Sequence, residues 1–285
     1  MAPGIETRSA NLYSVQDLRF MDQPDRLRAQ YLAAQPFPHL IVDDLFPASW
    51  IRNILNECRE DRNLCWKSFD TALQKKRGTQ PDSDFPPYLQ KYFDFINSGP
   101  FLRLMTQLTG IEALLPDPTL YGGGLHVVSG QGFFDLHIDF QHHPTTLLTN
   151  RLVIITYLND EWDQTCGGNL ELWAMNPARR AVEIIPHFGR TVLMEQSAIA
   201  AHGHPTPILA GRERMAVIAY FYTSDAGTQR VRRRRTSTLY VPRFGRSANA
   251  RLQAALHNVL PQPIIRGLRT VRRVLRALPR RSGER

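Results

Sequence analysis

The sequence predicts a mainly β fold with flanking helices, in which eight short strands form a sandwich or barrel. From Thr119 onward, short runs rich in Val, Ile, Leu, Phe and Tyr alternate with Gly, Pro, Asn and Asp, a pattern typical of such folds. Strands are expected at 119–129, 133–139, 151–159, 169–175, 181–186, 191–197, 201–208 and 212–223.

The residues before Thr119 are expected to support this core with helices and one strand. A short strand follows the proline break at Pro36, and Pro47 opens a helix in which Ile51 and Leu55 recur at helical spacing. Residues 62–85 are polar and rich in turn formers, which predicts a loop or flap. Further helices are expected over part of 16–32 and over 87–96 and 100–108.

We expect three regions: an N-terminal helical and mixed support region at 1–118, a β core at 119–225, and an Arg-rich C-terminal extension at 226–285. The extension holds sixteen arginines and one acidic residue, a net charge of +15, which leaves −6 for residues 1–225 out of the total of +9. An anionic partner is therefore expected only at the extension. Its amphipathic segment 264–278 suits an anionic membrane surface, whereas nucleic acid is disfavoured because no aromatic residue interleaves the arginine run.

The number and spacing of the cysteines indicate the cellular compartment. The three cysteines, Cys58, Cys65 and Cys166, are scattered and odd in number, so we expect no disulfide framework and a reducing cytoplasm. The first seven residues lack the basic and apolar sections of a secretory signal. No apolar run approaches the length of a membrane span.

His137 and Asp139 are two residues apart in the second expected strand, so their side chains point to the same face. An imidazole and a carboxylate that converge there are suitable ligands for a divalent transition metal. A third ligand must come from a facing strand, and the seventh expected strand offers both His202 and His204. Two histidines and one carboxylate leave three coordination positions open, which is typical of non-haem Fe(II) oxygenases.

A co-substrate carboxylate would need a cationic anchor near such a metal. Arginine suits this role because its planar fork can hold both carboxylate oxygens. Arg212 and Arg214 open the last expected strand. A buried strand rarely begins with cations unless something pairs with them, so we expect one of the two to face inward.

These residues belong to an ordered set of motifs within Leu125 to Thr223. In chain order the set is His137-x-Asp139, Tyr157-Leu158-Asn159 with Trp162, Gly167-Gly168-Asn169-Leu170-Glu171-Leu172-Trp173, His202-Gly203-His204-Pro205, and Arg214 leading into Tyr220-Phe221-Tyr222-Thr223. The set resembles the 2-oxoglutarate/Fe(II)-dependent oxygenases, and within them it is similar to the prolyl 4-hydroxylase-like branch. Many relatives carry a hydroxyl residue two positions after the arginine, where this sequence has Ala216.

The resemblance implies that 119–225 is a catalytic core with a double-stranded β-helix fold, which is jelly-roll or cupin-like. It implies His137, Asp139 and His202 as the catalytic iron ligands, since His202 opens the His-Gly-x-Pro turn where this branch places its ligand. Arg214 would bind the distal carboxylate of 2-oxoglutarate, and Tyr157 would add a hydrogen bond. The implied cofactor and co-substrates are Fe(II), 2-oxoglutarate and O2, with ascorbate in a supporting role. The implied reaction is hydroxylation of an unactivated C–H bond.

The sequence also allows two hypotheses other than an oxygenase. His204 could complete a closed four-ligand zinc site in a non-redox β-barrel with a structural or hydrolytic role, although Arg214 then has no function. The chain could instead be a binding protein whose basic extension contacts an anionic surface. For the oxygenase, the candidate substrates are an amino acid, a peptidyl residue or a small metabolite, and neither the choice among them nor the oligomeric state follows from the sequence.

Overall fold

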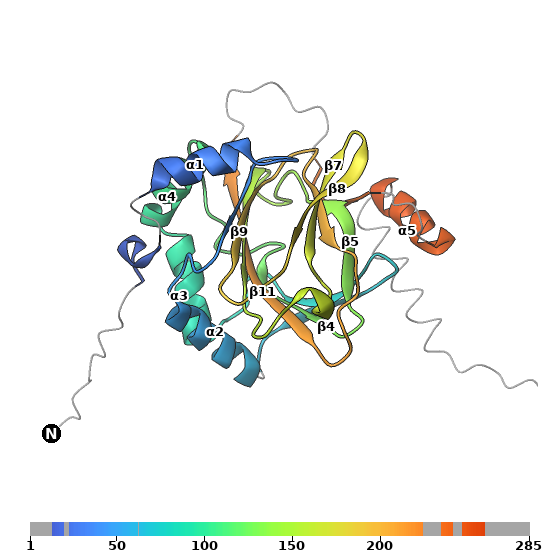
Figure 1. Ribbon diagram of the computed structural model, residues 1–285, viewed down its shortest axis with the longest axis horizontal. Helices are drawn as coiled ribbons and strands as arrows, with labels where there is room; N and C mark the ends of the chain where they lie inside the picture. Colours follow the sequence, from blue (N-terminus) through green and yellow to red (C-terminus); the bar gives the residue numbers. More distant parts are fainter. Residues whose placement is uncertain (1–12, 20–22, 62, 225–234, 242–246, 260–285) are drawn as a thin grey trace, which may run out of the picture.

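The computed structural model describes residues 13–19, 23–61, 63–224, 235–241 and 247–259. Its strands form one curled antiparallel sheet with the order β1-β9-β6-β11-β4-β3-β5-β10-β7-β8, while β2 pairs with β3 and β12 pairs with β5. The sheet folds back on itself, so that the β9-β6-β11-β4 half faces the β5-β10-β7-β8 half (Figure 1). This arrangement is a double-stranded β-helix, and the predicted fold class is confirmed.

All eight strands predicted after Thr119 are present. Their bounds are β4 Gly124–Ser129, β5 Phe133–Ile138, β6 Thr149–Tyr157, β7 Leu170–Met175, β8 Ala178–Ile184, β9 Thr191–Glu195, β10 Ala201–His204 and β11 Glu213–Thr223. Strands β6 and β11 pair over eight residue positions at the centre of one half and are buried on both faces, because helices cover one face and the second half of the sheet covers the other.

The helices of the N-terminal region cover the outer face of the β9-β6-β11-β4 half (Figure 1). They are α1 Pro24–Ala33, α2 Ala48–Glu60, α3 Pro87–Ile96 and α4 Gly99–Thr109, and a 3-10 turn η1 Val15–Asp17 precedes them. Phe46, Phe93 and Phe101 are fully or almost fully buried between helices and sheet, and the Tyr92 hydroxyl lies 2.8 Å from the Thr156 hydroxyl on β6. The expected strand after Pro36 is β1 His39–Val42, which extends the sheet beyond β9.

The expectation of a loop or flap at 62–85 is wrong. This segment forms a hairpin of β2 Trp66–Asp70 and β3 Gln74–Thr79, and β3 joins the two halves of the sheet by pairing with both β4 and β5. On β3, the outward Lys75 is exposed and the outward Arg77 is half-buried, while the inward Gln74 and Lys76 face the space between the two halves instead of an apolar core. The hairpin therefore lacks the apolar alternation that makes a strand recognisable in a sequence.

The described part of the C-terminal extension packs on the outside of β5 (Figure 1). It contains β12 Leu239–Tyr240 and α5 Ala248–Val259. The Tyr240 hydroxyl accepts a hydrogen bond of 2.8 Å from the Gln74 side chain on β3. The amphipathic segment predicted at 264–278 lies outside the described residues. None of the helices in the described ranges is long and apolar enough to cross a membrane.

Candidate active site

A bulge in β5 sets the direction of the side chains that converge between the two halves of the sheet. His137 on β5 lies opposite His202 on β10, but the next aligned pair is Phe134 with His204, so three residues of β5 match two of β10. Both Phe134 and His137 consequently face inward. Gly203 makes the close approach of the strands possible, because a Cβ there would lie only 2.8 Å from a backbone oxygen of β5.

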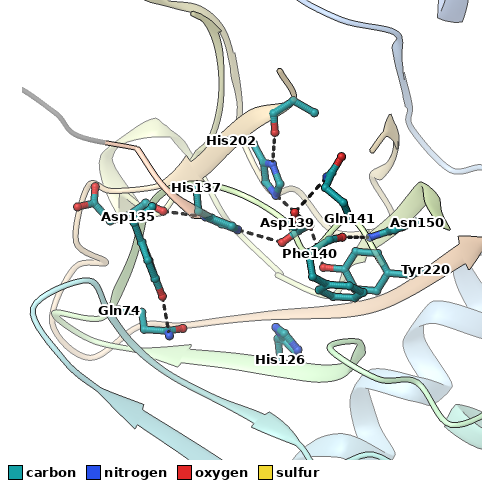
Figure 2. Close-up of polar contacts among 12 residues, drawn as sticks. Gln74, His126, Asp135, His137, Asp139, Phe140, Gln141, Asn150, His202 and Tyr220 are labelled. Carbon is teal, nitrogen blue, oxygen red and sulfur yellow. Dashed lines mark hydrogen bonds and ion pairs between the residues drawn. The ribbon is translucent and has the colours of Figure 1, made fainter. Parts of the chain in front are cut away.

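His137, Asp139 and His202 each present one ligand atom to the same point, and these atoms lie within 4.8 Å of one another. The His137 Nε2 atom is 3.4 Å from Asp139 Oδ1, and the His202 Nε2 atom is 3.5 Å from Asp139 Oδ2 (Figure 2). All three side chains are buried. Among the residues that the structure describes, this is the one set of three or more ligand-type side chains gathered closely enough to hold a metal ion.

Backbone carbonyls fix the tautomers of the two imidazoles. The Nδ1 atom of His137 donates to the carbonyl oxygen of Asp135 at 2.8 Å, and the Nδ1 atom of His202 donates to that of Ala200 at 3.0 Å (Figure 2). A carbonyl oxygen can only accept, so each Nε2 atom keeps its lone pair for the centre of the group. This arrangement is the outer support that metal-bound histidines usually have.

The protonation states also suit a cation. Burial, followed by the neighbouring His137, lowers the pKa of His202 to about 4, so His202 is neutral near pH 7. Burial alone would raise the pKa of the Asp139 carboxyl, but the imidazoles of His202 and His137 and the Tyr220 hydroxyl outweigh it and hold that pKa well below its usual value. Asp139 is therefore a carboxylate at neutral pH.

Of the two arginines that the sequence offered, Arg214 on β11 faces inward, and only 5% of it is exposed. Its Nη2 atom donates to the Tyr157 hydroxyl at 3.2 Å, and its guanidinium carbon lies 4.9 Å from the centre of the Tyr157 ring. Gly168 packs against the arginine stem, since a Cβ at this residue would lie 3.1 Å from Arg214 Cδ. The structure thus brings Arg214 and Tyr157 together on the inner face of the core, and the Arg214 Nε atom has no hydrogen-bond partner among the described residues.

The comparison with protein families agrees with this geometry. Residues 123–222 match the family model described as the 2OG-Fe(II) oxygenase superfamily. This match lies within the β core expected at 119–225. The matched range includes the metal-ligand group as well as Tyr157 and Arg214. No curated protein matches the chain in sequence.

Solved structures share the fold of this chain at low sequence identity. A prolyl-4-hydroxylase from Pseudomonas putida is 16% identical with a TM-score of 0.51, and the match covers 69% of this chain and 98% of that one. A prolyl hydroxylase from Trichoplax adhaerens, in complex with a hypoxia inducible factor peptide fragment, is 16% identical with a TM-score of 0.51, covering 73% and 96%. The non-heme alpha ketoglutarate dependent epimerase SnoN from nogalamycin biosynthesis is 14% identical with a TM-score of 0.51, covering 77% and 85%.

The metal-ligand group fits the Fe(II) ion that the matched superfamily uses. Two neutral imidazoles and one carboxylate are the donor set of a facial triad, which leaves other coordination positions open. Metal–ligand bonds of about 2.0–2.2 Å hold neighbouring ligand atoms roughly 3 Å apart, close to the 3.4 and 3.5 Å separations between the carboxylate oxygens and the Nε2 atoms. A small movement of these side chains would accommodate the ion.

Tyr220 is a site residue that the sequence did not single out. Its hydroxyl donates to Asp139 Oδ2 at 3.0 Å (Figure 2). Burial, followed by the Asp139 charge, raises the pKa of Tyr220 well above its usual value, so it remains a donor. The available signal was the even spacing of Arg214, Ala216, Ile218 and Tyr220 on β11, which puts Tyr220 on the same face as Arg214.

The remaining candidates lie elsewhere. His204 faces inward on β10 and is buried, but it is not part of the metal-ligand group, so the four-ligand set of the zinc hypothesis does not assemble. Arg212 precedes β11 and is half-buried. Ala216, which replaces the hydroxyl residue of many relatives, is paired with Tyr157 on one side and with His126 on the other.

Proposed function

We propose that this chain is an Fe(II)- and 2-oxoglutarate-dependent oxygenase that hydroxylates an unactivated C–H bond of an amino acid, a peptidyl residue or a small metabolite. The observation that supports this most strongly is the convergence of His137, Asp139 and His202 in a core whose inner face also holds the buried pair of Arg214 and Tyr157. A protein that only bound a metal ion would have no use for the buried arginine. A protein that only bound a carboxylate would have no use for three metal-ligand side chains directed at one point.

In this proposal each residue has a distinct task. His137, Asp139 and His202 hold Fe(II) and leave three positions for 2-oxoglutarate and O2. Arg214 holds the distal carboxylate of 2-oxoglutarate in a bidentate pair, and the Tyr157 hydroxyl adds a hydrogen bond. When bound there, Fe(II) supplies the redox chemistry that couples decarboxylation of 2-oxoglutarate to succinate with oxidation of the substrate.

Other side chains keep this arrangement in place. The Tyr220 hydroxyl fixes one oxygen of Asp139, and the carbonyl oxygens of Asp135 and Ala200 fix the two imidazole rings. Burial of all three ligands limits the access of water to the reacting atoms. These contacts are expected to reduce the rearrangement that metal binding requires.

The proposed substrates include free amino acids, peptidyl residues and small metabolites. Among the proteins of similar fold are prolyl hydroxylases, one of them in complex with a peptide fragment, and an epimerase. A shared fold does not identify a substrate, because the substrate is selected by side chains that vary on a common scaffold. We therefore propose hydroxylation as the outcome and leave proline as one candidate among several.

The proposal extends to the other parts of the chain. Residues 1–118 would support the core at 119–225, and 226–285 would be an extension that contacts an anionic membrane surface through its arginines. Ascorbate would support turnover by keeping the iron reduced, and a reducing cytoplasm would suit the three cysteines, which form no disulfide among themselves.

The test is succinate release from 2-oxoglutarate by protein loaded with Fe(II) under air, in the presence of amino acids and peptides. We expect Fe(II)-dependent succinate, and we expect the His137→Ala variant to produce none. The His187→Ala variant is a matched control, because His187 lies in the turn between β8 and β9 and its backbone N–H bonds only to Ile185. Absence of turnover with every candidate, together with no uncoupled decarboxylation, would contradict the proposal.

A further inference from the structure

Lys76 is a cation on the inner face of the barrel to which the proposed function gives no task. It belongs to the hairpin strand β3, and its neighbours on the same face are Gln74 and Gly78. The Lys76 Nζ atom lies 3.9 Å from the centre of the Phe134 ring, and Phe134 in turn stacks on His137 with 3.7 Å between ring centres. One aromatic ring therefore separates this ammonium group from a metal ligand.

His126 on β4 holds the Lys76 ammonium group from the other side. The Nε2 atom of His126 donates to the carbonyl oxygen of Gly123 at 3.1 Å, so its Nδ1 atom accepts from Lys76 Nζ at 3.3 Å. Figure 2 shows His126 across the site from His202. Gly78 makes room for this ring, since a Cβ there would lie 3.0 Å from it. The ammonium group thus has a defined position between Phe134 and His126.

Lys76 has no carboxylate partner within the described part of the chain. The two adjacent cations on β3 lie on its outer face, where Arg77 is 3.8 Å from the carboxylate of Glu213 and Lys75 is exposed to solvent. An ammonium group has three N–H donors, and His126 takes one of them. Burial, only partly offset by the negative charge of Asp139, lowers the pKa of Lys76 to about 7. Lys76 is half-buried on this face, and an ammonium group held there without a carboxylate favours an anionic ligand.

The charges of the proposed complex indicate the sign of that ligand. Fe(II) and Arg214 together balance Asp139 and the two carboxylates of 2-oxoglutarate. Lys76 then adds one positive charge beside a metal site that is otherwise neutral. Arg214 and Lys67 are the other charged groups that act on Lys76, and both are cations. A neutral or cationic substrate would leave the Lys76 charge without a partner.

We propose that Lys76, positioned by His126 and Phe134, binds a carboxylate of the primary substrate, so that the oxygenase acts on an acidic amino acid, a free amino acid or a peptide that presents a carboxylate. This inference rests on the proposed function, because the charge balance assumes bound Fe(II) and 2-oxoglutarate. Lys76 is a specificity-determining residue in this account. The carboxylate is either the α-carboxylate of a free amino acid or the side chain of Asp or Glu in a peptide.

The experiment compares Lys76→Met with Lys75→Met. Both substitutions remove one ammonium group from the same strand, but Lys75 faces outward. One set of probes pairs each of the twenty free amino acids with its C-terminal amide. A second set pairs tripeptides that contain Asp or Glu with the same tripeptides containing Asn or Gln. Succinate release is measured with Fe(II) and 2-oxoglutarate, and thermal shifts are measured on protein loaded with Mn(II) and 2-oxoglutarate.

For wild type and Lys75→Met, we expect turnover and thermal shifts with the carboxylate member of a pair and not with the amide. For Lys76→Met, the apparent KM for that acid is expected to rise about ten- to a hundredfold, as the loss of one charge-assisted hydrogen bond predicts. The KM for 2-oxoglutarate and the uncoupled decarboxylation should stay within about twofold of wild type. Lys76→Gln serves as a second variant and should behave in the same way.

Three results would overturn the inference. Amides that serve as well as acids, or a panel in which no acid binds, would show that no carboxylate is recognised. A KM for 2-oxoglutarate that rises in Lys76→Met would assign Lys76 to the co-substrate. Failure of the proposed function itself looks different, because wild type would then decarboxylate no 2-oxoglutarate under any condition.

Discussion

Arg214→Met is expected to remove 2-oxoglutarate binding while leaving the protein folded. The arginine is buried on β11, and Tyr157 is the side chain to which it donates. Methionine fills a similar volume without a charge. In the ligand-free protein the change removes one hydrogen bond, worth about 1 kcal/mol. It also removes a buried cation whose pKa burial lowers, so the free energy of unfolding should change by no more than about 2 kcal/mol.

Binding should respond far more strongly than stability. Truncating one partner of a buried charge pair costs about 2–5 kcal/mol, because the other charge is left buried without a partner. At about 1.4 kcal/mol for each factor of ten, the Kd for 2-oxoglutarate should rise roughly 30- to 4000-fold in Arg214→Met. The separation between a large binding loss and a small stability change is the signature of an anchor for the co-substrate.

The assay is calorimetric titration of Mn(II)-loaded protein with 2-oxoglutarate, combined with urea unfolding of the same samples. Arg212→Met is the matched control, since Arg212 lies two residues earlier and is half-buried, and it should bind 2-oxoglutarate as wild type does. A Kd for Arg214→Met within about twofold of wild type would refute the reasoning. An equal loss in Arg212→Met would also refute it, because the anchor would then not be specific to Arg214.

Three further outcomes are expected. Tyr220→Phe removes the 3.0 Å hydrogen bond to the Asp139 carboxylate, so metal affinity should fall about 10- to 100-fold; a titration with Mn(II) that shows no change would contradict this. His202→Ala should lose the metal in elemental analysis, whereas His204→Ala should keep one ion per chain. Burial lowers the pKa of His39 below that of the unfolded chain, so the unfolded state binds more protons below about pH 6.5. The free energy of unfolding should therefore decrease from pH 7 to pH 5, and more steeply in wild type than in His39→Gln; equal slopes would speak against a neutral buried His39.

The parts of the site that could be predicted from the sequence are those fixed by strand alternation. His137 and Asp139 were expected to share a face because they are two residues apart, and one of Arg212 and Arg214 was expected to face inward because a buried strand rarely begins with unpaired cations. The strand expected at 151–159 is present as β6. Each of these inferences needed only the period of a strand and the chemistry of the side chain.

The parts that could not be predicted depend on contacts between distant segments. The β5 bulge, which turns both Phe134 and His137 inward, becomes visible only when β5 is aligned with β10. In the sequence, Tyr220 cannot be distinguished from an aromatic residue of the core. Only the structure shows that its hydroxyl donates to Asp139. Lys76 lies in a polar stretch without an apolar period, so the sequence predicted a loop where β3 closes the sheet.

The most direct test of the central claim is the metal content and co-substrate binding of one protein sample. Protein reconstituted with Fe(II) in the absence of oxygen, and then dialysed, should retain one iron per chain, bind one 2-oxoglutarate, and convert it to succinate when air is admitted. His137→Ala should retain neither iron nor 2-oxoglutarate. A tightly held zinc ion that resists replacement by iron, in a protein that binds no 2-oxoglutarate, would contradict the account.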